Sequence, residues 1–242
     1  MDRGKSMTLT PPILFGSNKT SPCVSQVYGI SGSGKTFFLS EMLKKSRKSR
    51  EFPPLWRAVV FDVKHDGYAH LVEKVAYDME GFLKLIDKER LVVVHPDMEE
   101  APGFLDEVIA WFFHTAQRVD KFAATLIIEE SSTYIGSHAA SIPLSIKRFA
   151  TQGRSLGLSL ILANQRSLSN KWTDTQSQRC ILFRLAHPDR ELLKKRWGID
   201  PDELDGKLAE RKFSFAHYDL ESLTLDFYDP LPYPKTKPKK AA

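Results

Sequence analysis

The most constraining feature of this chain is a glycine-rich octapeptide. Residues Gly29–Thr36 read Gly-Ile-Ser-Gly-Ser-Gly-Lys-Thr and fit G-x-x-x-x-G-K-[ST] at every position. Glycines let the backbone wrap closely around phosphate oxygens, so that its N–H groups point inward. The apolar run Val24–Tyr28 before the loop predicts a strand, and the amphipathic segment Phe37–Lys48 after it predicts a helix. This context predicts a phosphate-binding P-loop rather than a glycine-rich turn that matches by accident.

The P-loop pattern also assigns roles to individual side chains. We expect Lys35 to reach the β- and γ-phosphates of a nucleotide and the Thr36 hydroxyl to ligate Mg²⁺. The predicted cofactors are therefore ATP and Mg²⁺. The other residues of the predicted nucleotide-binding set are Gly29, Ser31, Gly32, Ser33, Gly34 and Phe37.

Apolar, β-branched runs alternate with helical patterns along the chain, which predicts an α/β protein with a parallel sheet covered on both faces. Two runs near the end, 212–217 and 222–228, predict a β-hairpin that closes the sheet edge. The other predicted strands are 58–63, 91–95, 124–129, 158–164 and 179–184, and the other predicted helices are 70–75, 81–88, 102–120 and 144–151.

Composition favours one soluble domain. The chain has 242 residues, of which 42% are hydrophobic, and this is enough for one good core. We expect an extended N-terminal arm at 1–22 with a short strand at 13–15, a domain at 23–229, and a basic Pro/Lys-rich tail at 230–242. Without an apolar run of about 18 residues, a membrane span is not expected. We therefore expect a protein that stays in the cytoplasm or in a particle assembled there.

Two adjacent acids follow the apolar run 124–128. Glu129 is the predicted ligand of Mg²⁺ through its water shell, and Glu130 is the predicted base that polarises the attacking water. Neighbouring side chains on a strand point in opposite directions, so the strand must break here to bring both acids to one site.

Polar residues flank the run 158–164. Gln165, just after it, is placed to contact the attacking water or the γ-phosphate and to sense intact ATP. Arg154, before it, is the candidate arginine finger for a neighbouring subunit's site, where such residues stabilise developing charge. Arg148 and Arg166 compete for that assignment. A surface salt bridge for Arg154 and ordinary strand capping for Gln165 remain alternatives.

A second acidic strand end carries Asp62, Lys64 and Asp66. A role near the nucleotide and a structural or subunit-contact role are both open for these residues.

Four segments together resemble the FtsK–HerA superfamily of DNA-pumping P-loop ATPases. They are GISGSGKT (29–36), VVFDVKHD (59–66), LIIEES (126–131) and GRSLGLSLILANQR (153–166). The match covers roughly residues 24–190. The Glu-Glu pair, in place of Asp-Glu, resembles the HerA side of the superfamily. The compact size resembles the genome-packaging ATPases of tailless icosahedral viruses with an internal membrane. The sequence departs from HerA at Ser131 and Ser132, where a small residue and a histidine are expected.

The resemblance implies a three-layer, RecA-like P-loop NTPase fold with a mainly parallel central sheet. It implies a homohexameric ring that drives double-stranded DNA into a capsid, with capsid or viral membrane proteins as further partners and a packaging vertex of the virion as a location. By the same resemblance, Lys35 and Thr36 bind nucleotide and metal, Glu129 and Glu130 are the Walker B acid and the base, and Gln165 is the sensor. A plasmid or cellular DNA pump of the same superfamily is the alternative within this class.

Other functions stay open. A GTPase would need Asn-Lys-x-Asp, and the segment 170–173 fails because Asp174 falls one position late. A P-loop kinase would carry an arginine-rich lid, of which we find no clear example, and an ATP-binding scaffold would have no use for a base at Glu130. For DNA contacts, the candidate segments are the loops 134–145 and 166–179 and the basic cluster 194–196.

Overall fold

The computed structural model describes residues 14–15, 22–65, 67–136, 141–166 and 170–232. Within them, one sheet runs in the order β3-β2-β4-β5-β1-β6-β7-β8. The first six strands in this order are mutually parallel, and β7 and β8 add to the β6 edge as an antiparallel hairpin. The strands are β1 (Val24–Tyr28), β2 (Trp56–Phe61), β3 (Leu91–Val94), β4 (Ala123–Ile128), β5 (Leu158–Asn164), β6 (Arg179–Leu182), β7 (Phe215–Asp219) and β8 (Thr224–Tyr228).

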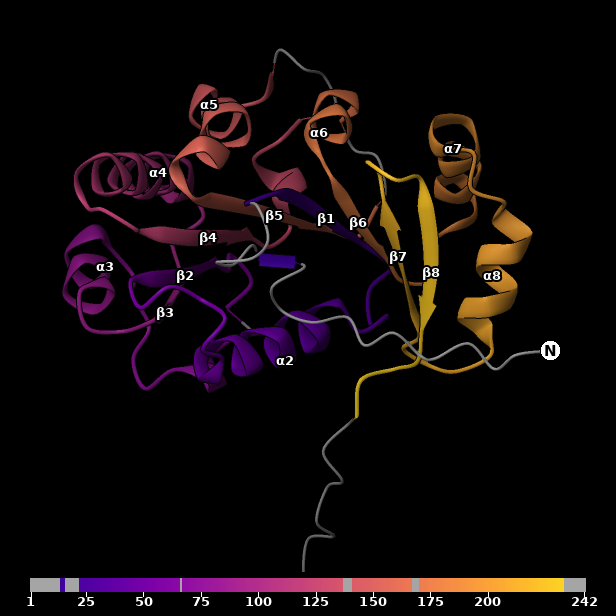
Figure 1. The fold of residues 1–242 in the computed structure, drawn as a ribbon, viewed down its shortest axis with the longest axis horizontal. Helices are drawn as coiled ribbons and strands as arrows, with labels where there is room; N and C mark the ends of the chain where they lie inside the picture. The colour runs from indigo at the N-terminus through magenta and orange to yellow at the C-terminus, as the bar shows by residue number, and fades with distance from the viewer. Residues whose placement is uncertain (1–13, 16–21, 66, 137–140, 167–169, 233–242) are drawn as a thin grey trace, which may run out of the picture.

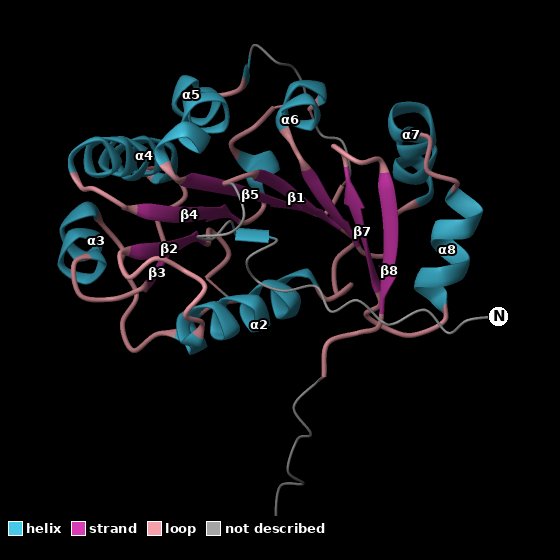
Figure 2. Ribbon diagram, viewed as in Figure 1, coloured by secondary structure: helices cyan, strands magenta, loops and turns pink. Residues whose placement is uncertain are grey.

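Helices cover both faces of the sheet and make the molecule three-layered (Figure 1, Figure 2). One face packs against α2, and the opposite face packs against α3, α4 and α5 over one half of the sheet and against α7 and α8 over the other. The predicted α/β fold with a mainly parallel sheet and a C-terminal hairpin is confirmed. The helices are α2 (Lys35–Lys48), α3 (Met79–Ile86), α4 (Ala101–Arg118), α5 (Leu144–Gln152), α6 (Lys171–Gln176), α7 (His187–Trp197) and α8 (Pro201–Ala209).

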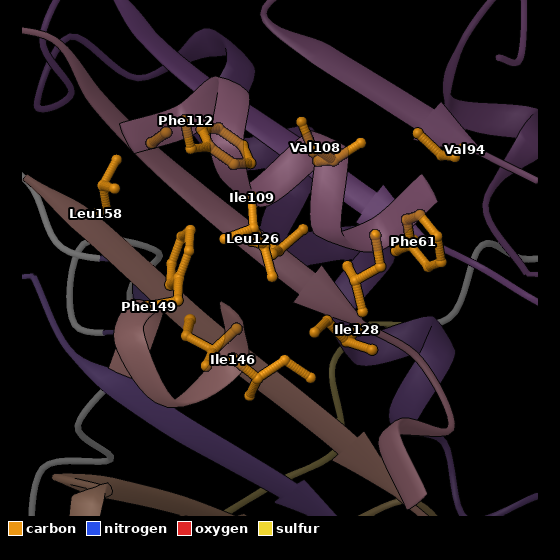
Figure 3. Packing of buried hydrophobic residues seen from close by; sticks show 14 of the residues in the cluster. Phe61, Val94, Val108, Ile109, Phe112, Leu126, Ile128, Ile146, Phe149 and Leu158 are labelled. Carbon is orange, nitrogen blue, oxygen red and sulfur yellow. The ribbon is translucent and has the colours of Figure 1, made fainter. Parts of the chain in front are cut away.

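The largest apolar cluster lies between the sheet and α4 and α5 (Figure 3). Phe112 and Phe149 meet edge to face across it, with ring centroids 5.8 Å apart, above Leu126 of β4 and Leu158 of β5. Burying each such side chain contributes about 1.5–3 kcal/mol. This packing fixes the parallel strands, and with them the loops at their carboxyl ends.

Two local predictions were wrong. Leu14 and Phe15 are helical rather than part of a strand, and they are buried against Phe52 and Trp56. In the segment 70–75, the only helical structure is the 3₁₀ turn Ala69–Leu71. Beyond that turn the chain runs extended, and Ala76 forms a parallel bridge to Val94. The N–H of Ala76 donates to the carbonyl of Val93, and the carbonyl of Ala76 accepts from the N–H of His95, so the chain joins the β3 edge directly after the predicted helix.

The C-terminal third contains helices that the sequence patterns did not reveal. The short α6 and the pair α7 and α8 fill the segments between β5 and β7, and α7 and α8 form their own apolar cluster against β6 and β7. The rest of the N-terminal arm, Asp66, and the tail from 233 onward lie outside the described residues. Among the described helices, none has both the length and the apolar character that crossing a bilayer would require.

Candidate active site

The P-loop joins β1 to α2 at the carboxyl edge of the parallel strands. Gly34 begins α2 with a φ of 108°, which is in the left-handed region that glycine adopts without strain. A Cβ at Gly29 would come within 2.6 Å of the Cβ of Phe183, so only glycine fits there. The loop therefore curves tightly over the N-terminus of α2, where backbone N–H groups and the helix dipole favour an anion.

Lys35 points back into the curve of this loop. Its Nζ donates to the carbonyl oxygen of Gly29 at 2.7 Å, and its side chain is buried. Burial lowers the pKa of Lys35, while the nearby carboxylates of Glu129 and Glu130 act in the opposite direction. A buried ammonium with only two carbonyl partners is a group that an anionic phosphate would stabilise.

The acidic pair lies where the sheet ends. The strand β4 stops at Ile128, and Glu130 takes φ 47° and ψ 46°, a left-handed conformation that is uncommon for a residue other than glycine. This reversal is the break that the sequence required, because it lets Glu129 and Glu130 line the same cavity.

Glu129 is the more deeply buried acid. Its Oε1 accepts a hydrogen bond from the Tyr68 hydroxyl and lies 3.4 Å from the Thr36 Oγ1. Burial raises the pKa of Glu129, and the Tyr68 hydrogen bond and Lys35 oppose that rise. Thr36 and Glu129, the two predicted metal residues, are thus side by side.

Glu130 is held from two sides. Gln165 Nε2 donates to its Oε1 at 2.9 Å, and the ammonium of Lys64 forms an ion pair with the same oxygen. The structure therefore brings the predicted base and the predicted sensor together. Asn164, which precedes the sensor, is committed elsewhere, because it bonds Ser131 and Ser132 and so ties the end of β5 to the turn after β4.

These groups surround a cavity of about 200 Å³. Its walls come from the P-loop, from the ends of β4 and β5, and from the loop after β2. The lining residues are Ser31, Gly32, Lys35, Thr36, Asp62, Lys64, Tyr68, Glu129, Glu130 and Gln165. A larger cavity of about 740 Å³ lies between α2, α3 and the chain before β3, and includes none of the predicted site residues.

The segment 62–68 is the part of the site that sequence reasoning left undecided. Buried Asp62 accepts hydrogen bonds from the backbone N–H groups of Lys64 and Gly67 and thereby folds the segment back over the P-loop. Tyr68 was missed entirely. Its partner Glu129 is 61 positions away in sequence, so only the tertiary fold reveals the contact.

Other predicted site residues lie off the cavity. Gly29, Ser33, Gly34 and Phe37 shape the P-loop or begin α2 without lining the cavity wall. Arg154 is exposed in the 3₁₀ turn before β5, at the amino end of that strand, whereas the cavity lies at its carboxyl end.

The full length of β5 separates Arg154 from the cavity. Seven residues at about 3.3 Å each put roughly 20 Å between the two ends of that strand. Arg154 therefore does not reach the cavity of its own chain. Its rival Arg148 stacks on Phe113, with Cζ 4.3 Å from the ring centroid, and Arg166 directly follows Gln165.

The candidate DNA segments are only partly described, because 137–140 and 167–169 fall outside. In the described parts of these two loops, Tyr134 is buried and Trp172 packs against the main core. Arg196 of the basic cluster is paired with buried Asp174, so it has a structural role.

The residues present fit a magnesium-bound nucleoside triphosphate. The P-loop at Gly29 leaves no room for a side chain, buried Lys35 faces the cavity, and the Thr36 hydroxyl and Glu129 carboxylate offer the hard oxygen donors that Mg²⁺ prefers. When bound, the metal would neutralise charge on the phosphates.

The P-loop lies at the end of the parallel strand β1, and the paired acids lie at the end of β4, two strands away in the sheet. This arrangement defines the class as a P-loop NTPase fold. No protein-family model matches the chain, and no curated protein matches it in sequence. The chain is similar in structure to several solved proteins.

One similar structure is the genome-packaging NTPase B204 of Sulfolobus turreted icosahedral virus 2 in complex with ATPγS. It has a TM-score of 0.66 and 18% identity over 86% of this chain and 98% of that one. The DNA-packaging ATPase B204 of Sulfolobus turreted icosahedral virus has a TM-score of 0.67 and 16% identity over 88% and 100%. The cytoplasmic domain of the type VII secretion ATPase EccC of Thermomonospora curvata has a TM-score of 0.53 and 13% identity, over 92% of this chain and 30% of that one. At these identities the comparison shows the fold.

Proposed function

We propose that this chain is an ATP-hydrolysing DNA translocase of the genome-packaging type. It acts as a homohexameric ring that drives double-stranded DNA into a viral capsid, in the host cytoplasm or at a packaging vertex of the virion, in contact with capsid or viral membrane proteins. The observation that carries the proposal is the convergence of Lys35, Glu130 and Gln165 on one cavity. The full-length likeness to the two B204 packaging ATPases supports the choice of translocation over other P-loop chemistry.

The residues divide the hydrolysis between them. The P-loop N–H groups and Lys35 would bind the phosphates, and Thr36 and Glu129 would hold the metal, which would neutralise phosphate charge. Glu130 orients a water and takes its proton as the water oxygen bonds to the γ-phosphorus and the bond to the ADP oxygen breaks. Gln165, on the same carboxylate, keeps that water in line and reports whether the γ-phosphate is present.

The test is Glu130→Gln, which keeps the shape and removes the base. We expect ADP to bind as to the unaltered protein and AMP-PNP to bind at least as tightly, while the ATPase rate falls by about 10²–10⁴-fold, the range that general-base catalysis supplies. Glu80→Gln on α3 is the matched control, because this exposed acid pairs with Lys84 away from the cavity. Turnover unchanged in Glu130→Gln would overturn the assignment of the base.

The translocase part needs its own readout. Duplex DNA should stimulate the ATPase of the unaltered protein, and the stimulation should fall steeply with added salt, because sequence-blind contacts to phosphates release counterions. If duplex DNA left the ATPase rate unchanged at every salt concentration, the protein would be an ATPase but not the proposed DNA translocase.

A further inference from the structure

Lys64 is the feature of the site that the proposed mechanism does not use. It is the third residue after β2 and lines the cavity beside Glu130. Among the residues that the structure describes, Lys35 and Lys64 are the two cationic side chains on the cavity wall. The first is committed to the P-loop carbonyls, whereas the second is bound to the proposed base.

The contact geometry places the Lys64 ammonium beside the residue that is assigned to the γ-phosphate. Lys64 Nζ and Gln165 Nε2 both donate to Oε1 of Glu130, so the two nitrogens are neighbours. Gln165 is the residue assigned to sense the γ-phosphate. A cation beside Gln165 is placed to meet the same terminal group.

The ion pair is also one that can exchange partners. The Lys64 side chain is 44% exposed and that of Glu130 is 15% exposed, and ion pairs this open to water contribute little on their own. The backbone of Lys64 is nevertheless fixed, because its N–H donates to buried Asp62 at 3.1 Å. Because the backbone of Lys64 is fixed and its side chain is flexible, the ammonium can move between two nearby anions without movement of the loop.

We propose that Lys64 is a γ-phosphate-responsive latch on Glu130: it pairs with the base when the cavity holds no triphosphate, and transfers to the γ-phosphate when ATP binds. The transfer leaves Glu130 free to orient water only when its substrate is in place. It also supplies, from within the same subunit, a positive charge on the phosphoryl group that is transferred. This inference rests on the proposed function, since it names how the same site is regulated.

The latch predicts a selective effect on triphosphate binding. Lys64→Met should weaken AMP-PNP binding by about tenfold or more, the range of a hydrogen bond to a charged group, and should change ADP affinity by less than about twofold. Lys64→Arg should retain most of the AMP-PNP affinity. Lys84→Met, which removes an exposed lysine paired with Glu80 outside the cavity, is the control and should leave both affinities unchanged. Affinities are measured by calorimetry with Mg²⁺ present.

A second variant tests the exchange itself. Glu130→Gln removes the carboxylate charge that competes with the γ-phosphate for the Lys64 ammonium. It should therefore tighten AMP-PNP binding in the protein that retains Lys64. This gain should vanish in the double variant with Lys64→Met. Equal effects of Lys64→Met on ADP and AMP-PNP, or the same gain in both backgrounds, would overturn the latch. Failure of the unaltered protein to bind either nucleotide would instead overturn the proposed function.

Discussion

At the residue scale, the two adjacent carboxylates differ in their surroundings. Glu129 is buried between the hydroxyls of Tyr68 and Thr36, whereas Glu130 reaches partly into solvent and meets Lys64 and Gln165. A buried carboxylate needs donors to offset lost hydration, and two hydroxyls supply them here. A more open carboxylate has room for a water. Environment thus separates a metal-side acid from a base within one dipeptide, as paired carboxylates do in other active sites.

The Tyr68 hydroxyl gives a residue-scale prediction. Because it fixes the orientation of the Glu129 carboxylate, Tyr68→Phe should lower the affinity of the nucleotide-bound protein for Mn²⁺ by about 10–100-fold, the effect expected of an outer partner of a metal ligand. Mn²⁺ binding is measured by electron paramagnetic resonance, and excess Mg²⁺ should restore much of the turnover.

Tyr134→Phe is the matched control. That tyrosine is also buried, and its hydroxyl has no hydrogen-bond partner among the described residues. If Tyr68→Phe lowered the melting temperature but left Mn²⁺ affinity unchanged, Tyr68 would be a packing residue and not a positioning residue.

At the element scale, residues 62–65 and 67–68 form the side of the site that faces the P-loop. This segment starts where β2 ends, and Asp62 folds it back by accepting two of its backbone N–H groups. Gly67 lies directly against Thr36, where an added Cβ would meet the Thr36 Cγ2 at 2.5 Å. The segment therefore packs on the metal-side threonine without space for one more methyl group.

Gly67→Ala tests this packing. The new methyl must push the segment away from Thr36, which is fixed in the first turn of α2, and displacement of about 1 Å in an active site can cost about 10²-fold in rate. We expect a loss of that order in ATPase turnover with little change in melting temperature. Gly103→Ala, where a Cβ meets no atom within 4 Å, should keep full turnover. Equal turnover in both variants would contradict a packing role for this segment.

At the scale of the whole molecule, the features that could be predicted from the sequence are those that depend on residues close together along the chain. The P-loop, the broken strand at Glu130 and the nearby Gln165 follow from local patterns, and the parallel sheet follows from alternating strands and helices. The wall formed by Lys64 and Tyr68 could not be predicted, because each contact spans more than 60 positions. The helix predicted at 70–75 failed because the chain directly after it, at Ala76, pairs with β3, and the local apolar pattern does not show that contact.

At this largest scale, the role proposed for Arg154 requires a second subunit. It is exposed at the edge of the sheet opposite the cavity, so it can meet a nucleotide only in a neighbour's site. In a ring, each complete site would then take Glu130 from one subunit and Arg154 from the next. Arg154→Ala and Glu130→Gln should each abolish turnover in uniform rings, the first by about 10³-fold or more.

Mixing these two inactive variants should restore part of the activity, because some interfaces then join an intact Glu130 to an intact Arg154. Mixing Arg148→Ala with Glu130→Gln is the comparison, since Arg148 is held against Phe113 within its own subunit and should retain turnover when changed alone. The measurement is ATPase rate against mixing ratio at fixed total protein, which should pass through a maximum near equal amounts. A rate that stays at the level of the two inactive parents at every ratio would rule out Arg154 as the residue shared between subunits.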